Sequence, residues 1–209
     1  MKKILYLLLH TQKHANRYDN CINTWLQGQD YLFYSDHEDL EKNILKVTDR
    51  NDYESNEEKF VNVVKTLPEE YFNYEWYFFV DSDTFVNTKK LVSILDTLDT
   101  NKFYGQKLCH WPGDEDMDFL SGGAGKLVSH VNFMEMREKI EIKGTGLADV
   151  CMGIYMKENN KIMEHSPLFK SQPPHHYKLE SKDSKDYISF HHIKNFEEMK
   201  SLYMNCINI

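Results

Sequence analysis

Two carboxylates, Asp81 and Asp83, stand one residue apart directly after the apolar run Trp76–Val80. The run is mostly aromatic, and it predicts a strand buried on both faces. At the end of such a strand, two carboxylates with this spacing can converge on one cation. Open α/β sheets bind ligands at the carboxyl ends of their strands, and Mg²⁺ or Mn²⁺ commonly bridges carboxylates to substrate phosphates there. We therefore expect a metal–diphosphate site at Asp81-Ser82-Asp83.

An Asp-x-Asp tripeptide also occurs in solvated turns, and the tripeptide by itself would favour a solvated turn. The residues around it favour a binding site instead. A buried strand precedes it, and Thr84-Phe85-Val86 follows it and leads into a helical pattern. The segment is therefore expected to be a strand–turn–helix junction, which favours the binding site.

A second informative stretch is Ser121-Gly122-Gly123-Ala124-Gly125. Glycines are entropically costly in a fold unless unusual dihedrals or a close backbone approach requires them. The stretch is either a tight turn or a wall lying against a ligand, and both interpretations stay open. Asp149 falls near the start of a predicted helix, where the dipole alone would favour a carboxylate. Taken alone, it is better interpreted as a helix cap than as a functional group.

The hydrophobic pattern around these stretches predicts an α/β fold. A buried strand at Ile4–Leu9, a helix ending at Gly28 and a strand at Tyr31–Tyr34 form a β-α-β unit, which requires a parallel sheet covered by helices. Further elements are expected in chain order: a short strand at Ile44–Val47, a helix begun by a Ser55–Glu58 capping box, a helix carrying Leu91, Ile94, Leu95 and Leu98, a strand at Phe103–Gly105, a helix carrying Leu127, Val131 and Met134, a helix from Leu147, a strand at Tyr187–Phe190, and a last helix capped by Asn195 and Glu198.

The composition excludes several classes of partner and of metal site. The chain has 209 residues, which suits a single domain with a substantial core, and a net charge of -8, which argues against nucleic acid or an anionic membrane as a partner. Its four widely spaced cysteines predict buried free thiols, not a zinc site. The apolar run after Met1 is too short for a signal peptide or a membrane span, so we expect a cytoplasmic protein. The acidic run Asp114–Asp118 lacks the glycine and glutamate of a calcium loop, so we expect a solvated loop there.

Together these stretches resemble the fringe-like and core 1 β1,3-galactosyltransferase-like family of inverting glycosyltransferases. The resemblance spans nearly the whole chain, and the turn Pro174–Tyr177 is more similar to the core 1 enzymes than to fringe. The stretches that carry it occur in the family's order: Arg17 before Thr24-Trp25, Phe33–Asp36, Asn56–Lys59, Trp76–Val86, Ser121–Gly125, Asp149–Gly153 and Ser189–His191.

The resemblance implies a GT-A fold, with a Rossmann-like, mostly parallel mixed sheet and helices on both faces. It also implies one catalytic domain over residues 1–209, with a nucleotide-sugar-binding half at 1–105 and an acceptor-side half at 106–209. The roles that it implies can be listed by residue: Asp83 and His191 as ligands of Mn²⁺ (or Mg²⁺), with Asp81 and Ser82 around the metal's waters and the ribose; Asp149 as the general base; Thr11, Arg17, Asp36 and Lys59 in the nucleotide pocket; and Gly122, Gly123 and Ala124 against the donor sugar or acceptor.

This chain departs from the family pattern in two places. Ala148 stands where the family often has a second acid before its base, and Ser82 stands in the middle of the usual acidic triplet. The expected activity is metal-dependent, inverting transfer of a hexose from a UDP-sugar to a hydroxyl of a glycan, glycopeptide or other acceptor, with a β1,3 linkage. Galactose is the favoured sugar and N-acetylglucosamine the next.

Two other functions remain possible at this point. Ala148 favours a non-catalytic nucleotide-sugar or glycan-binding module, whereas a two-metal nucleotidyltransferase would need a further carboxylate cluster that the sequence does not show.

Strand alternation predicts that His191 and His192 point in opposite directions, so that only one can bind the metal.

Overall fold

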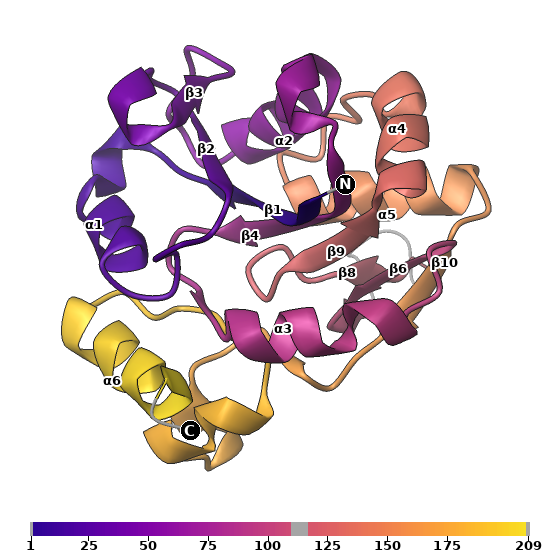
Figure 1. The fold of residues 1–209 in the computed structure, drawn as a ribbon. Helices are drawn as coiled ribbons and strands as arrows, with labels where there is room; N and C mark the ends of the chain where they lie inside the picture. The colour runs from indigo at the N-terminus through magenta and orange to yellow at the C-terminus, as the bar shows by residue number, and fades with distance from the viewer. Residues whose placement is uncertain (1, 110–116, 208–209) are drawn as a thin grey trace.

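A seven-stranded sheet crosses the molecule in the computed structural model, which describes residues 2–109 and 117–207 (Figure 1). The strand order is β10-β6-β9-β4-β1-β2-β3, and all neighbours are parallel except β9, which is antiparallel to both β4 and β6. The strands span Lys2–Leu9 (β1), Tyr31–Ser35 (β2), Ile44–Lys46 (β3), Tyr74–Asp81 (β4), Lys102–Gly105 (β6), Lys126–Ser129 (β9) and Ile162–His165 (β10).

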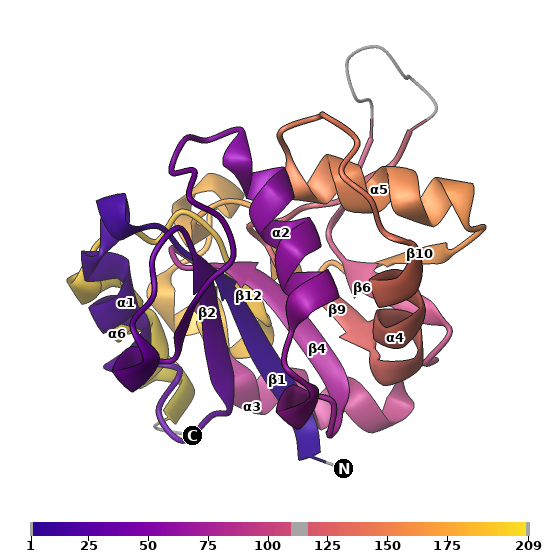
Figure 2. The ribbon, with the colours of Figure 1, turned by 90° about the horizontal axis from the view of Figure 1, so that it is seen from above.

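Helices cover both faces of this sheet (Figure 2). One face packs against α1, α3 and α6, and the other packs against α2, α4 and α5. The central strand β4 contributes side chains to the cores on both faces of the sheet. Phe78 packs in the core with α1, α3 and α6, and Phe79 packs in the core with α2, α4 and α5. The helices span Asn16–Ile22 (α1), Ser55–Thr66 (α2), Thr88–Ile94 (α3), His130–Lys139 (α4), Ala148–Glu158 (α5) and Phe196–Ile207 (α6). The predicted α/β class, with a mostly parallel sheet between helices, is confirmed.

A small second sheet brings the C-terminal part of the chain to the end of β4. Its order is β11-β12-β5, with β11 at Phe169–Lys170, β12 at Ser189–Phe190 and β5 at Phe85–Val86. Strands β5 and β12 are antiparallel, so the residues that follow β12 lie beside those that precede β5. The backbone N–H of Ile193 donates to the carbonyl oxygen of Asp83 at 2.8 Å, which fixes this junction. A third sheet pairs β7 (Lys107–Leu108) with β8 (Phe119–Leu120).

Two predicted elements are wrong. Residues 126–129 form strand β9 and not the start of a helix, because Leu127 and Val128 are buried in opposite cores; α4 begins only after Ser129, and Val131 is exposed. The Ser55–Glu58 capping box does not form. The Ser55 hydroxyl donates to the Asp52 carbonyl oxygen, and Glu58 accepts from Thr48 and Arg50.

The predicted cap of the last helix and the predicted state of the cysteines can be compared with the structure. Asn195 accepts the backbone N–H of Glu198 at 2.8 Å, so the predicted cap of α6 is confirmed. All four cysteines are unpaired thiols, three buried as expected, but Cys109 is exposed. Most of the acidic run Asp114–Asp118 lies outside the described residues. Over 2–109 and 117–207, no helix is long and apolar enough to cross a membrane.

Candidate active site

Asp83 is the centre of a charged cluster at the carboxyl end of β4. Its Oδ1 atom lies 3.1 Å from Nε2 of His191, and its Oδ2 atom lies 3.3 Å from a guanidinium nitrogen of Arg17. Nε2 of His191 also lies 3.5 Å from the Asp81 carboxylate. Strands β1, β2 and β4 are parallel, so their carboxyl ends meet at one edge, where the segment before β5 and the segment after β12 join them.

His192 lies beside His191, contrary to the prediction from strand alternation. The two imidazole rings stack with centroids 3.7 Å apart. Strand β12 ends at Phe190, and His192 has a positive φ of 64°, so the backbone turns and the alternation is lost. Ring nitrogens of His191 and His192 and a carboxylate oxygen of Asp83 all lie within 4.8 Å of one another.

These three side chains could hold a divalent cation. Carboxylate oxygen suits Mg²⁺ and Mn²⁺ alike, whereas imidazole nitrogen favours Mn²⁺ and other transition metals over Mg²⁺. One carboxylate and two imidazoles that already converge therefore fit Mn²⁺ better than Mg²⁺. The distances refer to the protein without an ion.

Electrostatics at this cluster keep Asp83 ionised. Burial by itself would raise the pKa of the Asp83 carboxyl, but the hydrogen bond and charge of His191, together with Arg17, outweigh burial and lower this pKa to about 2. Burial would lower the pKa of His191, but its contacts with Asp83 and Asp81 raise it. Burial raises the pKa of Asp81 to about 6, and the charge of His191 opposes this shift. The pKa of the Asp83 carboxyl is therefore clearly lower than that of the Asp81 carboxyl.

A cavity of about 310 Å³ opens next to this cluster, over the carboxyl ends of β1 and β4. Thr11, Arg17, Lys59, Asp81, Ser82, Asp83 and His191, all expected in the site, line it. Lys13 and Lys194 add positive charge to that of Arg17 and Lys59, whereas Asp52 adds a third carboxylate to Asp81 and Asp83. The cationic side chains, together with a cation held at Asp83, would suit an anionic ligand.

Asp36 is close to this cavity but does not line it. Its carboxylate accepts the Gln12 backbone N–H at 3.1 Å and lies 3.8 Å from the Lys59 ammonium. Both the Asp36 and Lys59 side chains are almost fully buried. Asp36 therefore holds the turn after β1 and orients Lys59, while Lys59 reaches the cavity.

A second cavity, of about 270 Å³, adjoins the first and contains Asp149. The two cavities share Leu9, Tyr53, Asn56, Asp81, His191 and His192. The second has no lysine or arginine among its lining residues, in contrast to the first. Asp149 lies in the first turn of α5 and does not cap it, since the N-cap is Leu147. One Asp149 oxygen accepts the Gly122 N–H at 3.3 Å, and the other accepts its neighbour's N–H.

The glycine-rich segment Gly122–Gly125 runs between the Asp149 carboxylate and the Asp83–His191 pair. A Cβ atom on Gly123 would lie 2.0 Å from Cε1 of His191, so only glycine lets the backbone pass the imidazole there. Gly122 and Gly123 line the second cavity. Ala124 does not line either cavity, because its side chain is fully buried in the core shared with α1 and α3. Gly125 has a φ of 97° and packs against Phe78.

Several residues of the site were missed from the sequence. His10 and His14 line the first cavity, and they could have been found because they follow the end of the first strand. Tyr53 lines both cavities while remaining 70% exposed, and no local pattern marks it. Lys126 lines neither cavity, but it is a buried lysine directly before Leu127 and Val128 in the short strand β9. Its ammonium lies over the Phe60 ring at 4.5 Å.

Comparisons with solved structures identify the fold. The chain is similar to the crystal structure of a glycosyltransferase involved in glycosylation of the major capsid of PBCV-1, with a TM-score of 0.56 and 15% sequence identity over 97% of this chain and 99% of that chain. It is also similar to the apo-form glycosyltransferase GlyE of Streptococcus pneumoniae TIGR4, with a TM-score of 0.49 and 11% identity over 85% of this chain and 49% of that chain. The first similarity confirms the predicted GT-A-type glycosyltransferase fold.

The sequence itself matches no protein-family model and no curated protein. At the identities above, the similarity extends to the fold and not to the fringe-like family in particular. The function must therefore be argued from the site.

Proposed function

We propose that this protein is a metal-dependent glycosyltransferase that uses a UDP-sugar as donor. The observation that carries the proposal is the pair of adjoining cavities. One contains Asp83 and four cationic side chains, those of Lys13, Arg17, Lys59 and Lys194. The other contains Asp149 and, among the described residues, no lysine or arginine, and both include Asp81 and His191. A donor diphosphate and an acceptor hydroxyl would meet at this shared boundary.

The first cavity supplies the groups that a nucleoside diphosphate requires. Arg17, Lys13 and Lys194 offer positive charge for phosphate oxygens, and Arg17 can bind two of them at once. Asp83, His191 and His192 would hold Mn²⁺, which when bound neutralises charge on the leaving diphosphate. Lys59 and Thr11 would contact the nucleoside end.

Asp149 is the residue that we propose as general base. One of its oxygens is held by the Gly122 N–H, which orients the carboxylate within the second cavity. A carboxylate so placed can take the proton of an acceptor hydroxyl. As it does so, the hydroxyl oxygen of the acceptor bonds to the anomeric carbon and the bond between the sugar and the diphosphate breaks. The reaction would invert the anomeric carbon, because no protein nucleophile is needed. General-base catalysis of this kind contributes about 10²–10⁴-fold to a rate.

The second cavity favours a neutral, hydroxylated acceptor. Its lining combines Tyr53 with small polar side chains such as Ser121, Ser171 and Gln172. Hydroxyl and amide groups suit sugar hydroxyls, and an exposed tyrosine ring suits the apolar face of a pyranose. Among the described residues, this cavity has no lysine or arginine to pair with an acidic acceptor, and the carboxylates of Asp81 and Asp149 would repel one. Among donor sugars, galactose remains our first choice and N-acetylglucosamine the second.

Turnover of a panel of nucleotide sugars tests the proposal. The protein would be incubated with UDP-galactose, UDP-N-acetylglucosamine and UDP-glucose, each with Mn²⁺ and with EDTA, alone and with simple saccharide acceptors. We expect Mn²⁺-dependent UDP release from at least one donor, accelerated by an acceptor. Tight UDP binding without any turnover would instead indicate a binding module, and pyrophosphate release from nucleoside triphosphates would indicate a nucleotidyltransferase.

A further inference from the structure

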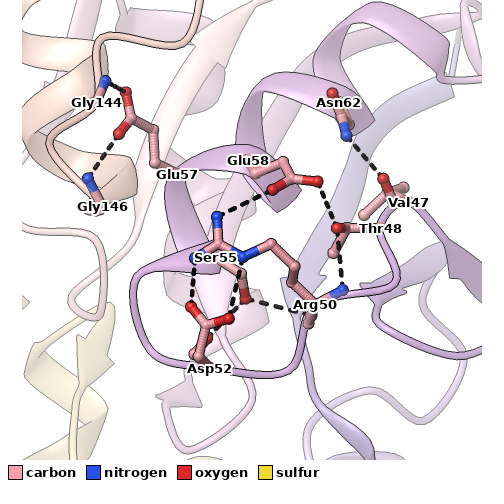
Figure 3. A network of polar contacts seen from close by, with 10 residues as sticks. All are labelled: Val47, Thr48, Arg50, Asp52, Ser55, Glu57, Glu58, Asn62, Gly144 and Gly146. Atoms are coloured by element: carbon pink, nitrogen blue, oxygen red, sulfur yellow. Dashed lines mark hydrogen bonds and ion pairs between the residues drawn. The ribbon is translucent and has the colours of Figure 1, made fainter.

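Glu57 is a carboxylate buried inside the protein at the start of α2, with 2% of its surface exposed. It points at the loop that leads into α5 (Figure 3). Oε1 accepts the backbone N–H groups of Lys143 and Gly144, the latter at 3.1 Å. Oε2 accepts the backbone N–H of Gly146 at 2.6 Å and the Thr145 hydroxyl at 3.1 Å. One side chain thus binds four consecutive residues.

The loop is shaped for this contact. Gly144 and Gly146 have positive φ values of 76° and 73°, which turn their N–H groups toward the same side. A Cβ atom on Gly146 would lie 3.2 Å from the Cα atom of Glu54, so the loop also packs closely against the start of α2. Asp149 follows Gly146 by three residues, and the loop therefore sets where Asp149 enters the second cavity.

The contact requires an ionised carboxylate. Burial by itself would raise the pKa of Glu57, but the backbone hydrogen bonds from Lys143 and Gly146 outweigh burial and lower this pKa. The four loop residues all donate to Glu57, as does the Cys151 thiol, and hydrogen bonds to an ionised acceptor are stronger than neutral ones. Glutamine has nearly the same shape, but its NH₂ group would face N–H donors and leave them unpaired.

Helix α2 also reaches the first cavity. Asn56 lines both cavities, and Lys59 lines the first one. The same helix turn therefore touches the diphosphate cavity through Asn56 and Lys59 and holds the Asp149 loop through Glu57. This turn of α2 therefore connects the Asp149 loop to the first cavity.

We propose that Glu57 is a positioning residue that holds Asp149 at the correct distance from the donor cavity. The inference rests on the proposed function, because it assigns Glu57 a role in the reaction of that site. Glu57 does not touch either cavity and acts through the backbone of residues 143–146. Misplacing a catalytic group by about 1 Å can cost about 10²-fold in rate.

The test compares Glu57→Gln with Glu58→Gln. Glu58 is the next residue on the same helix, but it binds Thr48 and Arg50 and makes no contact with the Asp149 loop in Figure 3. Hydrogen–deuterium exchange would report the loop directly. We expect the amides of residues 143–146 to exchange faster in Glu57→Gln and to stay protected in Glu58→Gln.

Kinetics with UDP-galactose and Mn²⁺ then separate positioning from folding. Glu57→Gln should lower kcat for UDP release by about 10²-fold while leaving KM for the donor nearly unchanged, because the donor cavity is intact. Thr145→Val removes one donor to Glu57, together with the hydrogen bonds of the Thr145 hydroxyl to the Leu147 backbone, and should give a smaller loss of kcat of the same kind. This variant keeps the test valid if Glu57→Gln does not fold.

The outcomes distinguish a failure of the proposed role of Glu57 from a failure of the proposed function. Unchanged kcat in Glu57→Gln and Thr145→Val, with an active wild type, would overturn the role of Glu57 and leave the proposed function standing. A rise in KM with unchanged kcat would do the same. A wild-type protein with no turnover on any donor would reject the proposed function, and the catalytic role of Glu57 with it.

Discussion

Nε2 of His191 lies 3.1 Å from Oδ1 of Asp83, although 108 positions separate the two residues in the sequence. Strands β5 and β12 make this contact possible, because each carries one partner to the same end of the central sheet. The carboxylate and the imidazole thus meet where the first cavity opens. This meeting is the structural basis of the proposed metal site.

Replacing Asp83 with asparagine should weaken Mn²⁺ binding in the presence of UDP by about tenfold or more, equivalent to about 1.4 kcal/mol. The change removes the only carboxylate of the Asp83–His191–His192 cluster. Titration calorimetry measures the affinity. Asp99→Asn is a suitable control, since Asp99 is an exposed carboxylate outside both cavities. Equal affinities in wild type and Asp83→Asn would exclude Asp83 as a ligand.

Replacing either histidine with alanine should also weaken Mn²⁺ binding. Both imidazoles offer a nitrogen within 4.8 Å of the Asp83 carboxylate oxygen, so each variant removes one potential ligand. Pulsed electron paramagnetic resonance of bound Mn²⁺ detects coupled imidazole nitrogens directly. We expect the nitrogen signal to decrease in His191→Ala and in His192→Ala. A signal that is unchanged in His192→Ala would restrict the site to His191, as strand alternation originally suggested.

Gly123→Val should impair Mn²⁺ binding and turnover, because its Cβ would lie 2.0 Å from Cε1 of His191 and displace that ring. Gly122→Ala is the matched control for the metal site. A Cβ on Gly122 would meet Asp149 at an ordinary 3.5 Å, so the Mn²⁺ affinity of this variant should not change. Normal Mn²⁺ binding by Gly123→Val, measured by calorimetry, would contradict the close approach of Gly123 and His191.

His10 should make the stability of the metal-free protein depend on pH. Burial, together with the neighbouring charge of His37, lowers the pKa of His10 to about 4. The unfolded state binds this proton near pH 6.5 and the folded state does not, so stability is full above pH 6.5 and falls as the pH drops toward 4. The slope contributed by one such group is at most about 1.4 kcal/mol per pH unit.

Denaturant unfolding of wild type and His10→Asn between pH 7 and pH 4.5 measures this contribution. The variant should lose part of the pH dependence. His176→Asn changes an exposed histidine outside both cavities and should keep the wild-type slope. Identical slopes for wild type and His10→Asn would show that His10 does not titrate differently in the two states.

Much of the fold could be predicted because hydrophobic patterning is local. The run Trp76–Val80 predicts its own burial on two faces, and the structure confirms this. Strand β9 was missed because four buried residues are too few to show a period, and the helix that follows hides the boundary. Similarly, the turn at His192 depends on one backbone dihedral that no side-chain pattern encodes.

The site was only partly predictable, for a similar reason. Asp83 stands out because a polar residue ends an apolar run, but Tyr53 and Glu57 act through tertiary contacts that join distant segments. Ala124 belongs to a motif that suggested ligand contact, yet its side chain packs in the core. Enlarging it should therefore destabilise the fold by about 1–3 kcal/mol instead of acting on the site.

The central claim is that Asp149 acts as the base of a sugar transfer that takes place between the two cavities. Asparagine at this position keeps the shape and can still accept the Gly122 N–H, but it cannot take a proton at neutral pH. The direct measurement is the kcat for Mn²⁺-dependent UDP-sugar turnover by Asp149→Asn, together with its affinity for UDP and Mn²⁺. The account predicts a loss of at least about 10²-fold in kcat with unchanged UDP affinity. Turnover near the wild-type rate would contradict it.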